Sequence, residues 1–356
     1  MRIAILAPIA WNIPPRAYGP WEAVAGSLAD GLASRGVDVT LFATARARTR
    51  ARLVATVPAP YREDPVWDPR VAETLHWAAC FERAGEFDII HNHTNCYPLA
   101  FTPLIRTPVV TTLHGSALLE PWTHPLYRRF RHLPYVSISN AERAGLPELN
   151  YVATVYNGID LAQFTFRPHP GSYLVFLGRM SAAKGVHLAI AIARRAGVPL
   201  RIAAHIPPDE RDYFDRMVRP QLGPGVEFVG EVGPPERDVL LGGALALLHP
   251  TTVPEPFGLT LVEAQATGTP VIGFNRGAVP ELVRDGETGF VVEDVDQAVR
   301  AVARVGALDR RRCRQWVEEH FTVDRMVDGY LEVYRRLLGG DAGRGTMEAD
   351  APPWPA

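Results

Sequence analysis

Two carboxylates, Glu255 and Glu263, stand eight residues apart where they could hold two parts of one ligand. Glu255 lies in the turn 254–259, in which two prolines fix φ and Gly258 tolerates unusual φ/ψ. Glu263 lies about two turns into an apolar segment that reads as a helix ended by Gly268. The start of this helix offers free N–H groups beside Glu255, and Glu263 could accept hydrogen bonds from both hydroxyls of a ribose. The alternative is a turn before an ordinary core helix, with Glu263 in solvent.

A second group of charged residues, Arg179 and Lys184, follows a predicted strand and precedes an amphipathic helix. In open α/β sheets, ligands bind at the carboxyl ends of strands, where helix N-termini present N–H groups and a positive dipole. The two cations could hold a diphosphate there, and Gly178 and Gly185 would let the backbone approach it closely. Val186 stands where a P-loop needs Ser or Thr, which disfavours a nucleoside triphosphatase. The alternative is a solvated basic loop.

Two further groups of polar residues contain side chains that could bind a metal. The segment 294–296 has the Asp-x-Asp pattern of some metal sites, but it stands directly before a predicted helix over 297–304. Asp at a helix start usually caps N–H groups, so a cap is favoured. His91 and His93 follow a predicted strand without a third ligand, which favours packing, structural hydrogen bonds or acceptor contacts over zinc. We therefore predict no metal site.

Short apolar runs alternate with helical patterns along the chain, and this alternation predicts two parallel α/β sheets in tandem. The predicted strands are 3–7, 37–43, 87–91, 109–113, 135–138 and 152–156 in the first half, and 173–177, 200–204, 226–229, 244–248, 271–274 and 290–292 in the second. A helix is predicted over 21–35. The Asn157-Gly158 turn and a proline-containing linker put the boundary between the two units within 157–170. The segment 341–356, rich in Gly, Ala, Asp and Pro, is predicted to be a disordered tail.

Composition bounds the class of protein. At 356 residues the chain is too long for one ordinary core and suits about two domains. Its 37 basic and 39 acidic residues create no global field for nucleic acid or a membrane, and the basic run 46–52 reads as a solvated loop or a local contact surface. Three widely spaced cysteines indicate neither a disulfide framework nor zinc. No segment approaches the roughly 18 apolar residues of a membrane helix. We expect a cytoplasmic protein without a nucleic-acid partner, while peripheral membrane contact stays open.

Taken in order, several motifs resemble those of glycosyltransferase family 4. They are Gly19 and the segments 112–115, 157–160, 178–185, 255–264 and 277–281. The resemblance extends up to about Leu338 and implies a GT-B architecture, in which two Rossmann-like, doubly wound parallel-sheet domains face each other across a cleft. It implies an acceptor-side domain over 1–165, a nucleotide-sugar-binding domain over 166–320, and a helix over 321–340 that crosses back to the first domain.

The resemblance also implies a donor site for a nucleotide diphosphate sugar. Its members, carried over by position, are Gly19, Gly178, Arg179, Lys184, Glu255, Phe257, Gly258, Leu259 and Glu263. Within this set the two cations would hold the diphosphate and Glu263 the ribose, while Glu255 and the N–H groups of 257–259 would meet the sugar. Pro20 departs from the family pattern, because many relatives have a second glycine there. Proline has no N–H, so a donor contact from that position is lost and the loop is stiffer.

The implied activity is glycosyl transfer with retention of anomeric configuration. The implied catalytic residues are His114, Glu255, Arg179 and Lys184. The cations would stabilise the leaving diphosphate without a metal or another cofactor, while Glu255 positions the sugar and His114 lies beside it. Glu255 as a covalent nucleophile is the alternative. A second class of function also stays open: a GT-B-like epimerase, a phosphorylase, or a non-catalytic protein that binds sugar nucleotides. The acceptor is a glycan, a lipid-linked sugar or a small molecule, and the sequence does not predict the oligomeric state.

Overall fold

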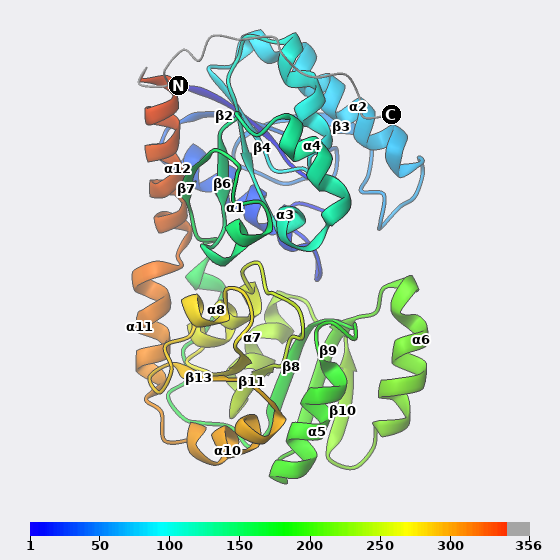
Figure 1. The fold of residues 1–356 in the computed structure, drawn as a ribbon, viewed down its shortest axis with the longest axis vertical. Helices are drawn as coiled ribbons and strands as arrows, with labels where there is room; N and C mark the ends of the chain where they lie inside the picture. The colour runs from blue at the N-terminus through cyan, green and yellow to red at the C-terminus, as the bar shows by residue number, and fades with distance from the viewer. Residues whose placement is uncertain (340–356) are drawn as a thin grey trace.

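The computed structural model describes residues 1–339, which form two α/β domains lying end to end (Figure 1). Each domain is built around one sheet, and all strand pairs described within the two sheets are parallel. Parallel sheets carry helices on both faces, because the crossover connections lie there. The predicted fold class of two parallel α/β sheets is therefore confirmed. The predicted tail at 341–356 lies outside the described residues.

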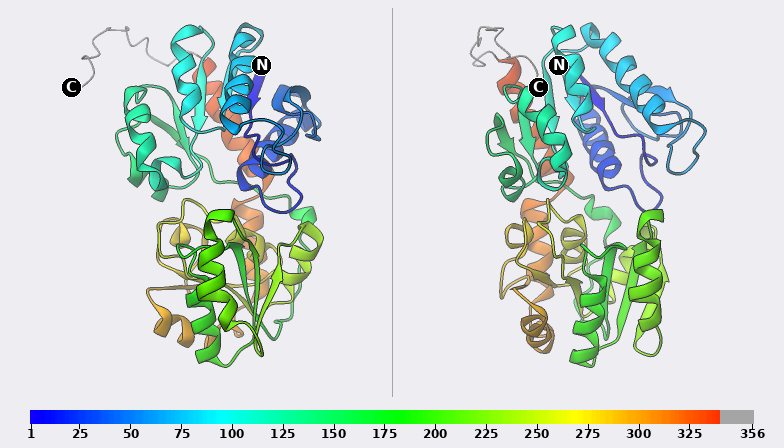
Figure 2. Two further views of the ribbon diagram at one scale, coloured as in Figure 1. Left: turned by 90° about the vertical axis from the view of Figure 1, so that its right-hand side faces the viewer. Right: turned by 45° about the vertical axis from the view of Figure 1, so that its right-hand side comes forward.

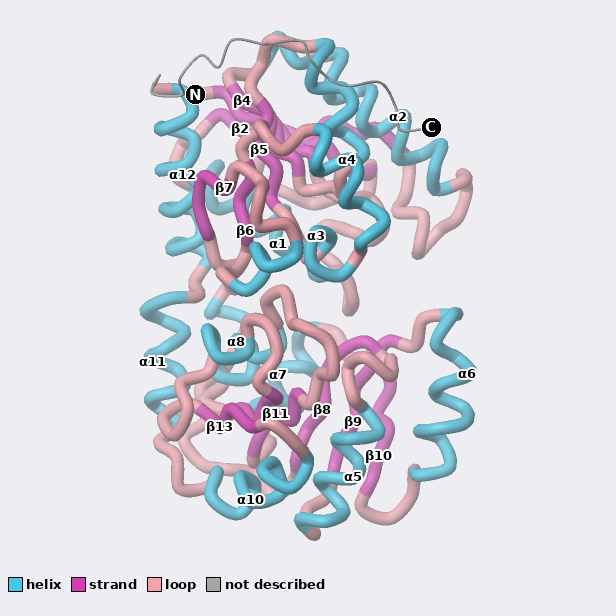
Figure 3. The backbone as a smooth tube through the Cα atoms, viewed as in Figure 1, coloured by secondary structure: helices cyan, strands magenta, loops and turns pink. Residues whose placement is uncertain are grey.

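The first domain contains a seven-stranded sheet with the order β3-β2-β1-β4-β5-β6-β7. The strands of both domains are drawn in magenta in Figure 3. Its strands are β1 (Arg2–Leu6), β2 (Asp38–Thr44), β3 (Arg52–Val57), β4 (Ile89–Asn92), β5 (Val109–Thr112), β6 (Tyr135–Ser137) and β7 (Tyr151–Thr154). The strand order reverses between β1 and β4. The loops that follow these two strands leave the sheet at the same edge, and such a reversal is where open α/β sheets form a ligand crevice.

The second domain contains a six-stranded sheet with the order β10-β9-β8-β11-β12-β13. Its strands are β8 (Leu174–Arg179), β9 (Leu200–His205), β10 (Val226–Gly230), β11 (Ala246–His249), β12 (Val271–Phe274) and β13 (Gly289–Val292). Here the order reverses between β8 and β11, which pair directly. The segments that follow these two strands hold Lys184 and Glu255, so the topology brings the two predicted site segments together.

Helices cover the faces of both sheets. The α-helices of the first domain are α1 (Pro20–Ser34), α2 (Pro69–Glu82), α3 (Ser116–Leu119) and α4 (His124–Arg129). Those that follow are α5 (Val186–Ala196), α6 (Arg211–Tyr213), α7 (Pro234–Gly242), α8 (Leu259–Ala266), α9 (Val279–Leu282), α10 (Val295–Val305), α11 (Arg310–His320) and α12 (Val323–Leu338). The predicted cap of α10 is confirmed, because the Asp294 carboxylate accepts a hydrogen bond of 2.8 Å from the backbone N–H of Gln297.

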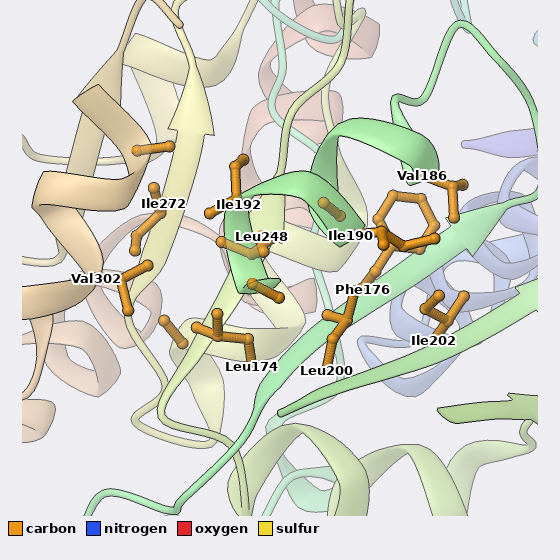
Figure 4. Close-up of a cluster of buried hydrophobic side chains, with 14 of the residues drawn as sticks. Leu174, Phe176, Val186, Ile190, Ile192, Leu200, Ile202, Leu248, Ile272 and Val302 are labelled. Atoms are coloured by element: carbon orange, nitrogen blue, oxygen red, sulfur yellow. The ribbon is translucent and has the colours of Figure 1, made fainter. Parts of the chain in front are cut away.

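Buried apolar side chains join each sheet to its helices. In the second domain, Leu174 and Phe176 of β8 pack with Ile190 of α5 and Leu248 of β11 in one cluster (Figure 4). These residues are at most 1% exposed, so the start of α5 is held firmly on the sheet. This packing fixes the loop that carries Lys184 relative to β11.

The last helix, α12, packs on the first domain although it follows the second in the chain (Figure 2). Val327 and Tyr330 of α12 share a buried cluster with Leu28 of α1. Arg35, the residue directly after α1, forms an ion pair of 2.9 Å with Asp324 of α12 at the surface. The first domain is therefore completed by residues from the far end of the described chain.

The edge strand β3 was not predicted. Its first residue, Arg52, is the last residue of the basic run 46–52, and the residues before it form a loop. Only Val57 of this strand is buried, so β3 shows no run of apolar residues or clear alternation that could mark it as a strand. Among residues 1–339, no helix has the length and apolar character needed to cross a bilayer.

Candidate active site

Glu255 meets two cationic or polar partners at one oxygen. Lys184 Nζ lies 2.5 Å from Glu255 Oε2, and Nε2 of His249, the last residue of β11, lies 2.8 Å from the same oxygen. The structure therefore brings together two residues predicted from separate motifs. His249 was not predicted, although its place at the carboxyl end of a strand and six residues before Glu255 was a usable signal.

Glu255 is an ionised carboxylate. It is 5% exposed, and burial alone would raise its pKa, but the charge of Lys184 and the hydrogen bond from His249 outweigh burial and lower the pKa well below its ordinary value. Within residues 1–339, no hydrogen bond reaches its second oxygen, Oε1. One oxygen is thus fixed by the protein, and the other is free to accept a hydrogen bond from a ligand hydroxyl.

Gly277 holds the backbone of the Glu255 turn in place. The two residues form an isolated β-bridge, and the N–H of Ala278 donates to the carbonyl of Glu255 at 2.8 Å. Gly277 has φ +58°, and a Cβ at this position would lie 2.3 Å from the backbone nitrogen of Glu255. Only glycine fits without moving the turn.

We expect Gly277→Ala to destabilise the protein by about 2–4 kcal/mol, because it combines strain at positive φ with a clash against the backbone of Glu255. Urea unfolding measures this cost. Gly286→Ala is the matched control, because Gly286 has φ +76° and a Cβ there would meet no atom within 4 Å, so it carries the strain alone. Equal losses of stability in the two variants would contradict the clash.

Glu263 lies on α8 and forms an ion pair with Arg237, a residue that was not predicted from the sequence. Its Oε1 lies 3.1 Å from Nη1 of Arg237 on α7. Burial raises the pKa of Glu263, and the charge of Arg237 opposes this rise only in part. Arg237 belongs to no motif, and its meeting with Glu263 depends on how α7 and α8 pack. The pair forms part of a cavity wall.

A cavity of about 710 Å³ is lined by residues of both domains. Of the predicted donor-site residues, Gly19, Gly178, Leu259 and Glu263 line this cavity. Six other predicted site residues do not line it: Arg179, Lys184, Glu255, Phe257, Gly258 and His114. The predicted residues therefore fall into a cavity group and a second group centred on the contact between Lys184 and Glu255. Gly178 and Arg179 join the two groups, because they are adjacent in β8.

Arg179 and the turn 257–259 offer hydrogen-bond donors without partners in the described chain. Arg179 is exposed at the end of β8, and its guanidinium has no salt bridge or hydrogen bond within residues 1–339. The side chain of Phe257 is buried against Tyr156 and Phe321, so only its backbone can face a ligand. Gly258 precedes the first residue of α8, where backbone N–H groups lack acceptors in the helix.

The loop before α1 touches the second domain at the cavity wall. The N–H of Tyr18 donates to Oε1 of Glu231 at 3.0 Å, and the ring of Tyr18 stacks on His205 at a centroid distance of 5.1 Å. Pro20 is the first residue of α1, where the missing N–H costs no helical hydrogen bond. Gly19 is therefore carried by a loop that both domains hold in place.

His114 lies two residues beyond the end of β5 and is buried in a polar network of the first domain. Its Nε2 is 3.0 Å from Nδ1 of His93, and its ring stacks on Trp21 of α1 at 5.6 Å. His93 continues to His91, which contacts the hydroxyl of Tyr334 on α12 at 2.6 Å. This confirms hydrogen bonding for His91 and His93. Burial lowers the pKa of His114 to about 3, so this residue is a neutral hydrogen-bonding group near pH 7.

The loop after His114 contacts the Glu255 turn of the other domain. A Cβ at Gly115 would lie 2.7 Å from Cγ of Pro256, and the hydroxyl of Ser139 donates to the Pro256 carbonyl at 2.6 Å. Beside this contact, Glu281 accepts hydrogen bonds from the backbone N–H groups of 140 and 141 at 2.9 and 2.7 Å. The structure thus places the His114 loop against the turn that carries Glu255.

The comparisons with known proteins agree with this geometry. Residues 161–320 match the family model described as glycosyl transferases group 1, and residues 22–163 match the model of glycosyltransferase family 4. Glycogen synthase of Mycobacterium tuberculosis is 29% identical, over 94% of this chain and 95% of the relative. Phosphatidyl-myo-inositol mannosyltransferase of Mycobacterium leprae is 25% identical, over 86% and 87% of the two chains.

A solved structure adds to the comparison of folds. The Anabaena protein HepE in complex with UDP and glucose has a TM-score of 0.74 at 18% identity, covering 94% of this chain and 99% of that chain. At this identity the likeness concerns the fold alone. The two family matches and the paired parallel-sheet domains lead to one conclusion: the chain belongs to glycosyltransferase family 4, with the GT-B fold, and is a glycosyltransferase.

Proposed function

We propose that this enzyme moves a sugar from a nucleoside diphosphate sugar to an acceptor hydroxyl, with retention of anomeric configuration and without a metal. The observation that carries the proposal is the contact of 2.5 Å between Lys184 Nζ and Glu255 Oε2, where the second domain meets the first. It sets a cation suited to a phosphate beside an ionised carboxylate suited to a sugar hydroxyl. The complex of HepE with UDP and glucose supports a donor of this class.

The cavity group is assigned to the nucleoside. Glu263 accepts hydrogen bonds from the ribose hydroxyls, and Gly178 allows the backbone to approach the ligand. At the adjoining end of β8, Arg179 and Lys184 bind the diphosphate. Arg179 is suited to this role because its guanidinium forms no ion pair with a carboxylate within residues 1–339, so no ion pair has to break before it binds phosphate.

The transfer step breaks the bond between the anomeric carbon and the β-phosphate oxygen and forms a bond from that carbon to the acceptor oxygen. Arg179 and Lys184 stabilise the negative charge that develops on the leaving phosphate. The acceptor oxygen attacks from the face of the sugar that the phosphate leaves, so the configuration is retained, and the acceptor proton passes to the leaving phosphate oxygen. Glu255 Oε1 accepts a hydrogen bond from a sugar hydroxyl, and neutral His114 provides a hydrogen bond from the first domain.

Two observations favour a positioning role for Glu255 over a covalent one. The hydrogen bond from His249 to Oε2 weakens the carboxylate as a nucleophile. The second carboxylate, Glu263, pairs with Arg237 beside the proposed ribose position, so the two do not form the acid and nucleophile pair of a glycoside hydrolase.

The acceptor is a hydroxyl-bearing glycan, lipid-linked sugar or small molecule. Use of a nucleotide sugar suits a cytoplasmic enzyme. The buried free thiols of Cys80, Cys96 and Cys313 also fit a reducing compartment.

The test incubates the purified protein with UDP-, GDP- and ADP-sugars in the presence and absence of EDTA, and measures released nucleoside diphosphate and the configuration of the product. Glu255→Gln is the inactive control. We expect one class of donor to release its nucleoside diphosphate at a rate that EDTA leaves unchanged. A donor that yields only its epimer, a product of inverted configuration, or a rate abolished by EDTA would contradict the corresponding part of the proposal.

A further inference from the structure

The side chains of the two residues that contact Glu255 Oε2 differ in how freely they can move. Lys184 is on the loop before α5, and its long side chain is 24% exposed. His249 ends a strand in the middle of the sheet, and its side chain is 6% exposed. When the donor diphosphate binds, we expect the ammonium of Lys184 to turn from the carboxylate toward the phosphate, because its long side chain can move. His249 has no such freedom and stays at Oε2.

This difference matters because Glu255 is buried. A buried carboxylate without a partner takes up a proton, since burial disfavours the charged form. The charged or titratable groups in contact with Glu255 are Lys184 from the loop before α5 and His249 from β11. In the first-domain loop, burial and, to a smaller extent, the charge of Glu255 raise the pKa of Tyr18. The neighbouring segment at Gly277 provides backbone contacts. Once Lys184 has turned away, His249 is the remaining hydrogen-bond donor to Oε2.

Resting on the proposed function, we infer that His249 is a positioning residue. Its Nε2–H holds Glu255 Oε2 in the donor-bound enzyme, so that the carboxylate stays ionised and Oε1 stays directed at the donor sugar while Lys184 binds the diphosphate. His249 acts through Glu255 and does not itself touch the reacting atoms.

The test compares His249→Leu, which removes the donor, with His249→Gln, whose amide nitrogen reaches about as far as Nε2. UDP, or the nucleoside diphosphate of the accepted donor, is titrated by calorimetry at pH 7.5 in buffers of different ionisation enthalpy, which reports protons taken up on binding. We expect close to zero uptake in the wild type and His249→Gln, and uptake approaching one proton in His249→Leu. His187→Leu is the matched control. His187 is on α5, its Nδ1 forms a hydrogen bond of 2.8 Å with the hydroxyl of Tyr213, and it has no contact with Glu255.

The pH profile of transfer gives a second readout. Glu255 must be ionised, and loss of His249 removes an interaction that lowers its pKa. The acid limb of kcat is therefore expected to move toward neutral pH in His249→Leu, with kcat at pH 7 reduced at least tenfold, and to return close to the wild-type position in His249→Gln. A side chain with a purely structural role would lower thermal stability without moving this limb.

Two outcomes separate the role of His249 from the proposed function. If wild type and His249→Leu share the same proton uptake and acid limb, the role of His249 is overturned and the proposed function stands. If the wild type binds none of UDP, GDP and ADP, the proposed function is overturned together with the role of His249. Should His249→Leu fail to fold, His249→Asn replaces it, because its shorter amide stays polar but does not reach Oε2.

Discussion

Replacing Lys184 by alanine is expected to lower kcat/KM for sugar transfer by about 100- to 1000-fold, the usual effect of removing one hydrogen-bond donor at a developing anion. The variant loses the cation at the leaving phosphate, and it leaves the buried Glu255 with His249 as its remaining hydrogen-bond donor. Release of nucleoside diphosphate measures the rate, and calorimetry measures nucleotide affinity.

The matched control is Arg195→Ala on the adjoining helix α5. It removes a cation of an exposed ion pair with Asp296, and exposed pairs contribute little to stability. We expect its rate to stay within about twofold of the wild type, because the ion pair of Arg195 is with Asp296 and the side-chain partners of Glu255 are Lys184 and His249. A Lys184→Ala enzyme that kept more than a fifth of the wild-type rate would refute the assignment of the phosphate site.

Lys184 can also be observed directly, because it is the only lysine in the 356-residue chain. An amine-selective acetylating reagent therefore has two targets, the α-amino group and Lys184. Bound nucleoside diphosphate is expected to protect the lysine and leave the N-terminal amine reactive. This readout checks the contact without any substitution.

Glu263→Ala is expected to weaken binding of the nucleoside diphosphate by about 10- to 100-fold, which corresponds to losing one or two hydrogen bonds to a charged acceptor. The variant also leaves the Arg237 guanidinium in the cavity wall without its carboxylate. Glu263→Gln keeps one acceptor oxygen, so we expect an intermediate loss. Calorimetric titration with UDP, GDP and ADP measures the effect.

Nucleotide binding is expected to weaken as the pH falls through the raised pKa of Glu263, because the protonated carboxyl can accept fewer hydrogen bonds. Glu287→Ala on the surface of the same domain is the control. Unchanged nucleotide affinity in Glu263→Ala would contradict the assignment of the ribose to Glu263, and the nucleoside site would then lie elsewhere.

The sequence predicted most of the fold because the central strands are buried on both faces and read as continuous apolar runs. It missed β3, where Val57 is the single buried residue. It predicted Glu255 and Lys184 from motifs that fix local geometry. It missed Arg237, because the contact of Arg237 with Glu263 depends on how α7 and α8 pack. It also missed His249, although His249 ends a strand and lies six residues before Glu255. Which strand lies beside β8 cannot be read from the composition of β8.

The use of lysine and arginine in this chain is strongly unequal. The chain has 37 basic residues, and arginine occupies all but one of these positions. A lone lysine among so many arginines indicates a position that suits a compact ammonium group and not a planar fork. The structure shows such a place, since Nζ approaches a single carboxylate oxygen that it shares with His249.

The packing of α12 has a consequence for biosynthesis. Tyr330 and Tyr334 are fully buried in the first domain, yet they are among the last described residues to be translated. Domains generally fold from the N-terminus as they leave the ribosome. Here the N-terminal domain cannot complete its core until the second domain and α12 have been synthesised. Until then the apolar surface of α1 that α12 covers stays exposed.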